Sequence, residues 1–196
     1  MASEAHYVVD TDLYPAGAPA PSNGSAVSWS AVIAGTVAAV SLTLVLLTLG
    51  SAFGLASVSP WPGVGAKPSS FTIGAGVWMV FTQWLSAMLG GYIAGRLRVR
   101  WHGLHTDEVF FRDTAHGFLT WATATVVMAV VAVIATILSS AAAPPVDATA
   151  TKEAVDAARK AAAAFAGFTG LSLVIGAFVG SVGGAIGGGL RDKSQP

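Results

Sequence analysis

Four long stretches of this 196-residue sequence contain no Asp, Glu, Lys or Arg. Each is longer than the roughly 20 residues that an α-helix needs to cross the hydrocarbon core of a bilayer. Helices and closed barrels are the structures that satisfy every backbone hydrogen bond in that environment. We therefore predict an all-α integral membrane protein, a four-helix bundle. The charge-free stretches lie between Asp12 and Lys67, Lys67 and Arg96, Asp113 and Asp147, and Lys160 and Arg191.

The composition agrees with this prediction. Charged residues make up 10% of the chain and hydrophobic residues 54%, whereas soluble domains carry about 25% charged residues. The chain has no cysteine, which excludes disulfides, thiolate catalysis and cysteine-bound metals. Its formal net charge is zero, so we expect no nucleic-acid partner.

Residues 1–28 are rich in Pro and Gly and lack apolar periodicity, which is typical of a disordered tail. The tail has no Lys or Arg, so we do not expect a cleaved signal peptide. A polar, Ala-rich helix is predicted at 147–160, capped by Asp147 and carrying an Asp156–Lys160 pair, and it runs directly into the fourth span. The single transmembrane domain, 29–191, has its spans at about 29–56, 71–95, 114–140 and 161–190.

Glycine recurs every fourth residue near the C-terminus, which leaves one helix face without side chains and lets another backbone approach it closely. The string Gly90–Arg98 aligns without gaps on Gly183–Arg191. We interpret the two strings as the ends of two helical hairpins in one orientation, although Gly-rich sequence also produces such matches by chance. We expect glycine-zipper interfaces, with the second and fourth spans packed together within the chain. The predicted helix-packing residues are Gly91, Gly95, Gly176, Gly180, Gly184 and Gly188.

Lys and Arg set the predicted orientation, because cytoplasmic loops are enriched in them. With both termini cytoplasmic, the cytoplasmic side would hold Arg96, Arg98, Arg100, Arg112, Arg191 and Lys193. The other side would hold Lys67, Lys152, Arg159 and Lys160, three of them on the polar helix beside acids.

The connection between the second and third spans has the densest charge in the chain. His102, His105, Asp107 and Glu108, with His116 further on, are competent zinc or iron ligands, but their spacing matches no familiar motif. A pH-sensing role for these histidines is a second interpretation. The third is a solvated loop whose acids pair with Arg112 and whose basic residues meet lipid headgroups. The predicted headgroup contacts are Arg96, Arg98, Arg100 and Trp101.

Little else in the sequence indicates chemistry. We find no nucleophile–base arrangement, and we predict no enzyme activity and no cofactor. Gln83 is the one amide side chain within the predicted spans, where it either bonds to a neighbouring helix or lines a permeation path. Carriers place ionisable groups at mid-membrane, and the predicted spans have none apart from His116 near one edge. This argues against an ion-coupled transporter and leaves a passive pore open.

Three strings carry a resemblance to known proteins: Ser28–Gly35, Gly90–Leu97 and Thr106–Trp121. With them the chain resembles a group of uncharacterised bacterial membrane proteins sometimes labelled "PhnA-like". The resemblance covers most of residues 28–190 and implies a bacterial inner-membrane protein. The group has no established activity, so it supplies no functional residues.

Three function classes follow. The first is a non-enzymatic packing or scaffold protein that lies in the lipid bilayer and self-associates or supports a larger membrane complex. The second is a passive channel or small-solute facilitator formed by oligomerisation. The third is a metal- or pH-responsive sensor that uses residues 102–116.

Overall fold

The computed structural model describes residues 25–59, 64–65, 67–99, 105–142 and 151–193. Residues 1–24 of the predicted tail and the predicted cap Asp147 therefore lie outside the described residues. Four helices are long and apolar enough to cross a membrane, which confirms the predicted four-helix fold. They are α1 (Trp29–Ser57), α2 (Pro68–Leu97), α3 (Thr106–Ala142) and α4 (Lys152–Lys193).

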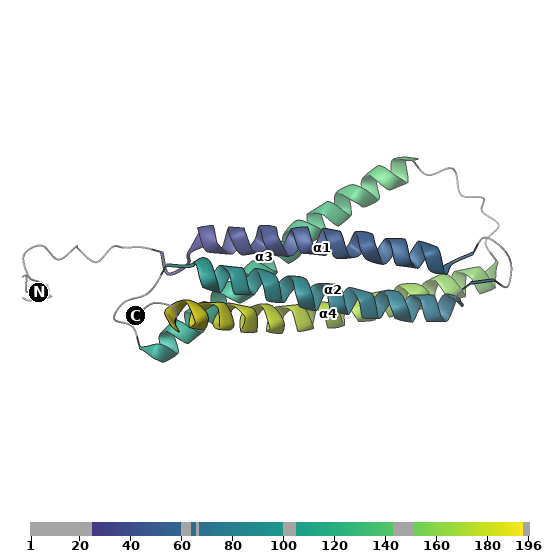
Figure 1. Cartoon of the computed structure of the whole chain (residues 1–196). Helices are drawn as coiled ribbons and strands as arrows, with labels where there is room; N and C mark the ends of the chain where they lie inside the picture. Colours follow the sequence, from purple (N-terminus) through teal and green to yellow (C-terminus); the bar gives the residue numbers. More distant parts are fainter. Residues whose placement is uncertain (1–24, 60–63, 66, 100–104, 143–150, 194–196) are drawn as a thin grey trace, which may run out of the picture.

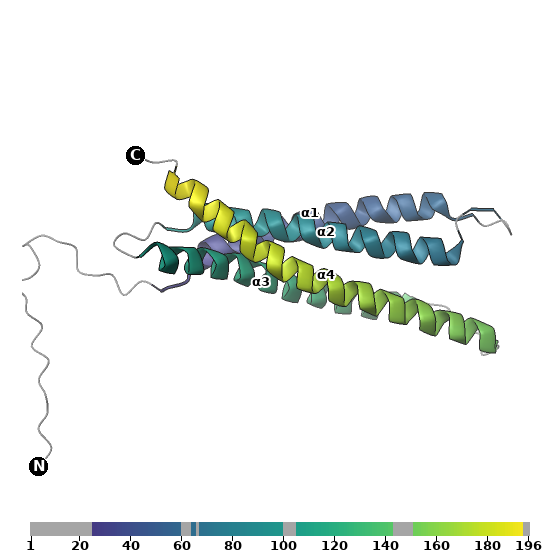
Figure 2. The same ribbon diagram turned by 90° about the horizontal axis from the view of Figure 1, so that it is seen from below.

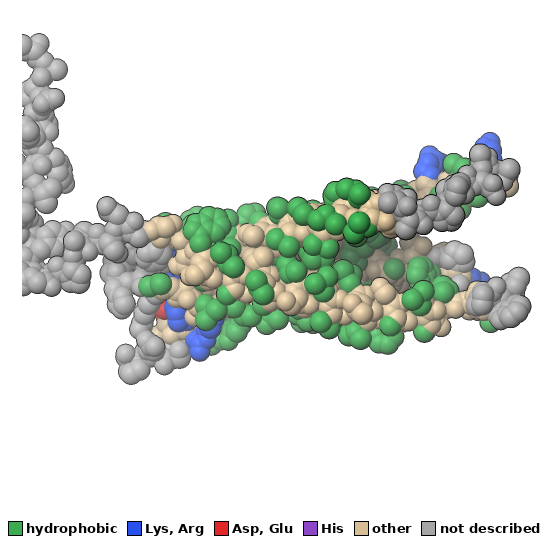
Figure 3. Space-filling model, turned by 90° about the horizontal axis from the view of Figure 1, so that it is seen from above, with side chains coloured by type: hydrophobic (Ala, Val, Ile, Leu, Met, Phe, Trp, Pro, Cys, Tyr) green, Lys and Arg blue, Asp and Glu red, His purple; other side chains and the backbone are tan. Residues whose placement is uncertain are grey.

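Helix α2 is central, because α1, α3 and α4 all pack against it. Helices α1 and α2 run side by side, and α4 packs against α2 and α3 rather than against α1. Figure 2 shows α4 crossing α1 and α2 obliquely, and Figure 1 shows α3 running obliquely to the other helices. The start of α1 and the end of α4 lie at the same end of the bundle, which we call the termini-bearing end. Figure 3 shows hydrophobic and uncharged atoms along the length of the bundle, with Lys and Arg near its two ends. This distribution is compatible with a multi-pass membrane protein.

The third helix begins earlier than the sequence predicted. Residues 106–113, expected as part of a loop, form the first two turns of α3. Asp107 and Glu108 occupy the first turn, where negative charge stabilises the helix dipole. Glu108 also pairs with Arg112 one turn later, at 2.6 Å, which is the pairing expected for that arginine. A helix of 37 residues is about 55 Å long, so it extends well beyond the hydrocarbon core.

The fourth helix is continuous over 42 residues, as the prediction of a polar helix running into the fourth span requires. Its N-cap is Thr151, whose hydroxyl accepts a hydrogen bond from the Ala154 amide at 3.2 Å. Asp156 contacts Arg159 at 3.6 Å rather than the Lys160 that the sequence suggested.

Glycines bring α2 and α4 into backbone contact. A Cβ atom built on Gly91 or Gly95 would overlap the backbone of Gly180 or Gly184, respectively. On the other side of the interface, Gly187 lies against the backbone of Tyr92. The prediction that the second and fourth spans pack together within the chain is thus confirmed by these contacts.

The bundle opens at the end opposite the termini. Residues 129–139 of α3 are all exposed, and Figure 1 shows this half of α3 diverging from the other helices. The first three turns of α4 are also largely exposed. The close packing of the four helices is therefore concentrated in the half that bears the termini.

Candidate functional site

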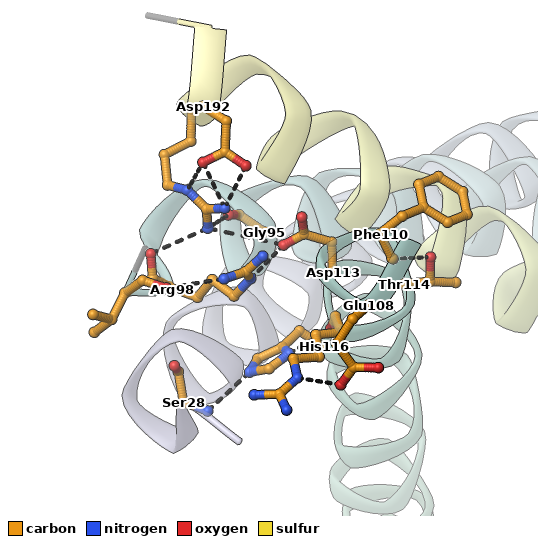
Figure 4. A network of polar contacts seen from close by, with 12 residues as sticks. Ser28, Gly95, Arg98, Glu108, Phe110, Asp113, Thr114, His116 and Asp192 are labelled. Carbon is orange, nitrogen blue, oxygen red and sulfur yellow. Dashed lines mark hydrogen bonds and ion pairs between the residues drawn. The ribbon is translucent and has the colours of Figure 1, made fainter. Parts of the chain in front are cut away.

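A cluster of charged and polar side chains lies inside the termini-bearing end of the bundle (Figure 4). Arg98 follows the last residue of α2, Asp113 and His116 lie on α3, and Arg191 lies in the last turn of α4. Arg98, Asp113 and His116 are 2%, 3% and 1% exposed, respectively. We call these four residues the ionic cluster.

Asp113 is the centre of the ionic cluster, because both arginines approach the same carboxylate oxygen. The Nε of Arg98 donates to Asp113 Oδ1, and Arg191 Nη1 lies 3.8 Å from that oxygen. Arg191 also forms a two-point contact with Asp192, at 2.9 and 3.1 Å. Two guanidinium groups are thus paired with two carboxylates, and of these pairs Arg98–Asp113 is the deeply buried one.

Arg191 also stabilises the end of α2. Its Nη1 donates to the backbone carbonyls of Gly95 and Arg98, at 3.1 and 3.2 Å. The last carbonyls of a helix have no partner within the helix, and a basic side chain satisfies them while opposing the negative end of the helix dipole. Arg191 of α4 therefore caps the C-terminal end of α2 and also takes part in the ionic cluster.

A glycine of α4 makes room for the Asp113 carboxylate. A Cβ atom built on Gly188 would overlap the carboxyl carbon and both oxygens of Asp113. Gly184, one turn earlier, lies against the backbone of Asp113 and Gly117. The glycines of α4 therefore serve α3 as well as α2.

His116 connects the ionic cluster to α1. The backbone N–H of Ser28 donates to His116 Nε2 at 2.8 Å, so this nitrogen carries no proton. The proton is on Nδ1, which donates to the carbonyl of Arg112 at 2.6 Å. The imidazole is thus neutral, and it holds the residue before α1 against α3.

The ionic cluster joins all four helices, and its polar groups are directed at one another rather than into an open cavity. Its contacts hold helix ends together.

The structure describes four of the predicted metal and sensor residues, His105, Asp107, Glu108 and His116. Among the described residues, no three His, Asp or Glu side chains come close enough to hold a metal ion. Both ring nitrogens of His116 are already used in hydrogen bonds to the backbone. His105, Asp107 and Glu108 are exposed around the start of α3, and His102 lies outside the described residues.

The predicted headgroup contacts need one correction. Arg98 is buried against Asp113 and does not face lipid, because α3 begins early enough to bring Asp113 beside it. Arg96 is half-buried in the last turn of α2. Arg100 and Trp101 lie outside the described residues.

The six predicted packing glycines all face a neighbouring helix. Gly176 leaves space for two polar side chains, because a Cβ there would lie within 2.7 Å of Gln83 Nε2 and Trp121 Nε1. Gln83 thus points from α2 toward α4, as the interpretation of a helix-to-helix contact requires. Gly180 lies against the side chain of Trp121. The other four predicted glycines make the contacts with α2, α3 or α4 that are given above.

Sequence reasoning missed Asp113 and the pairing of Arg191. One signal was present, since Arg98 and Arg191 close the two matching strings Gly90–Arg98 and Gly183–Arg191. Two arginines at equivalent positions on adjacent helices can meet a shared acid. Asp113 is the last charged residue before the third charge-free stretch.

No protein-family model, curated protein or solved structure matches this chain. The resemblance to the PhnA-like group therefore stays a prediction.

Proposed function

We propose that this chain is a non-enzymatic scaffold of the bacterial inner membrane that self-associates, with both termini in the cytoplasm. The charge distribution supports the orientation, because the termini-bearing end carries the larger set of basic residues. The ionic cluster supports a structural role, since it connects four helix ends. The opposite end of the bundle has no such cluster among the described residues, and α3 is exposed there.

The observation that carries this proposal is a row of small residues on α4. Ala163, Gly167 and Gly170 are spaced by four and three residues, so they share one face of the helix, and all three are exposed. A Cβ built on Gly167 or Gly170 meets no atom within 4 Å. We call these three residues the open row.

The rest of α4 indicates what the open row is for. Where α4 is packed, its glycines lie against the backbone or side chains of α2 and α3. A glycine inside a helix costs about 1 kcal/mol relative to alanine, and in membranes small residues mark the close approach of another helix. Among the described residues the open row has no such neighbour, and α3 diverges at this end of the bundle. A second copy supplies the missing helix.

Measuring the oligomeric state in lipid nanodiscs by native mass spectrometry tests the proposal. We expect wild type to form a dimer or larger assembly. Gly167→Leu should be monomeric yet folded, because a Cβ there meets no described atom within 4 Å in the monomer, whereas the leucine blocks a second backbone. Gly74→Leu is the matched control, since a Cβ at Gly74 also meets no atom within 4 Å. A monomeric wild type, or an unchanged assembly in Gly167→Leu, contradicts the proposal.

A passive facilitator is the second candidate, and one observation favours it. The hydroxyls of Thr82, Ser86 and Thr125 and the indole N–H of Trp121 are buried without a hydrogen-bond partner among the described residues. Polar groups of this kind in an apolar core attract water or a small polar solute. Stopped-flow swelling of proteoliposomes tests this candidate. Flux that falls in Thr82→Val/Ser86→Ala supports it, and flux equal to that of empty liposomes eliminates it.

A further inference from the structure

A groove of about 600 Å³ runs between α3 and α4 on the outer surface of the termini-bearing end. Its floor follows one row of α4, Ser181, Ala185 and Gly189, at four-residue spacing. A Cβ built on Gly189 meets no described atom within 4 Å, so no described side chain fills the space beside this residue. Lys193 continues the same row by four residues and also lines the groove, where it is the last lining residue of α4.

The walls of the groove are largely apolar, with Thr114 as their one polar residue. The parallel row of α4 contributes Phe178, Val182 and Ile186, which are 70%, 36% and 42% exposed. The opposite wall comes from the start of α3, where Phe110 is 62% exposed. Figure 4 shows Phe110 on the side of α3 away from the ionic cluster. The groove is thus separate from that cluster.

The groove has the length and polarity of one membrane leaflet. Phe178 and Lys193 are about 22 Å apart along the helix axis, at 1.5 Å per residue. Half of a bilayer including its headgroups is also about 20–22 Å thick. The apolar part lies toward the middle of the bundle and the ammonium group lies at its end, which matches a molecule with a long hydrocarbon chain and an anionic head.

We propose that this groove binds an anionic phospholipid of the leaflet adjoining the termini. An acyl chain lies along Ser181, Ala185 and Gly189 between the apolar walls, and the phosphate meets Lys193. Basic side chains beside grooves between membrane helices recognise anionic headgroups in this way. This site is distinct from the open row and does not depend on self-association.

Lipid binding by the full chain in detergent, followed by native mass spectrometry, tests this site. The probes are phosphatidylglycerol and phosphatidylcholine with identical acyl chains. Wild type should retain phosphatidylglycerol in preference to phosphatidylcholine. Lys193→Gln should weaken phosphatidylglycerol binding about fivefold and leave phosphatidylcholine unchanged, because one surface cation contributes about that factor. Lys152→Gln, at the other end of α4, is the charge control and should behave like wild type.

Gly189→Leu tests the acyl-chain part of the groove. A Cβ at this position meets no described atom within 4 Å, so we expect the leucine to occupy the groove and to give a folded protein that loses both lipids. Gly74→Leu, also open but outside the groove, should retain them. Lipid binding by Gly189→Leu equal to that of Gly74→Leu overturns the acyl-chain site. Equal retention of the two lipids by wild type, or an unchanged preference in Lys193→Gln, overturns the headgroup assignment. If Gly189→Leu does not fold, the lipid preference of Lys193→Gln, a change at an exposed residue, still tests the site.

Discussion

Replacing Asp113 with asparagine isolates the charge at the centre of the ionic cluster. Asparagine has almost the same shape as aspartate, so it fits the space that Gly188 leaves. The change removes the carboxylate that both Arg98 and Arg191 approach. The side chains of Arg98 and Asp113 are 0% and 4% exposed, so water cannot take the place of the lost charge.

The expected magnitude follows from this burial. Removing one partner of a buried ion pair costs about 3–5 kcal/mol, because the other charge stays buried without compensation. That is a rise of about 150- to 5,000-fold in the unfolding equilibrium constant. SDS titration of the protein in mixed micelles, followed by circular dichroism, gives the free energy of unfolding.

Two further variants test whether the loss of stability comes from an uncompensated buried charge. Asp192→Asn removes a carboxylate that is 31% exposed at the same end of the bundle, and it should cost less than about 1 kcal/mol. The double variant Arg98→Met/Asp113→Leu replaces the pair by apolar side chains and should recover most of the lost stability. The reasoning is wrong if Asp113→Asn unfolds within about 0.5 kcal/mol of wild type, or if the double variant is less stable than the single one.

Three other substitutions test the packing. Gly184→Leu should lower the free energy of unfolding by about 3 kcal/mol, because the neighbours of Gly184 are backbone atoms of α3. Unchanged stability and an unchanged oligomeric state would show that this face of α4 meets lipid instead. Arg191→Met removes two hydrogen bonds to carbonyls at the C-terminal end of α2 and should lower the free energy of unfolding by about 1.5–3 kcal/mol. Faster hydrogen exchange at that end of α2 would detect the loss, and unchanged protection there would show that Arg191 does not cap α2. Thr82→Val should leave stability unchanged or raise it by about 1 kcal/mol, since the buried hydroxyl has no partner among the described residues; a loss of more than 1 kcal/mol by SDS titration would reveal a partner.

The sequence was sufficient for the helices and for one interface. Charge-free stretches fix helices in a bilayer because charged residues are costly there, and α1 and α2 begin and end within a few residues of the predicted spans. The pairing of α2 with α4 was also predictable, because Gly91 and Gly95 on one helix and Gly180 and Gly184 on the other form complementary faces.

The ionic cluster was not predictable in the same way. The density of charge before the third span indicated a connection, but Asp107, Glu108 and Arg112 stabilise two additional helical turns. Those turns carry Asp113 to Arg98 and Gly188, which are far from it in sequence. The local sequence pattern indicates which residues meet water or lipid, whereas the meeting of helix ends in the ionic cluster depends on how the helices cross.

Disulfide cross-linking tests self-association most directly. The chain has no cysteine, so a single introduced cysteine cannot form a disulfide within the chain, and a covalent product of twice the chain's mass reports a second copy. Gly167→Cys in the native membrane should give a covalent dimer under mild oxidation. Leu55→Cys, whose parent side chain is 74% exposed on α1, should stay monomeric. Dimer formation at Leu55→Cys with none at Gly167→Cys would contradict assembly through the open row.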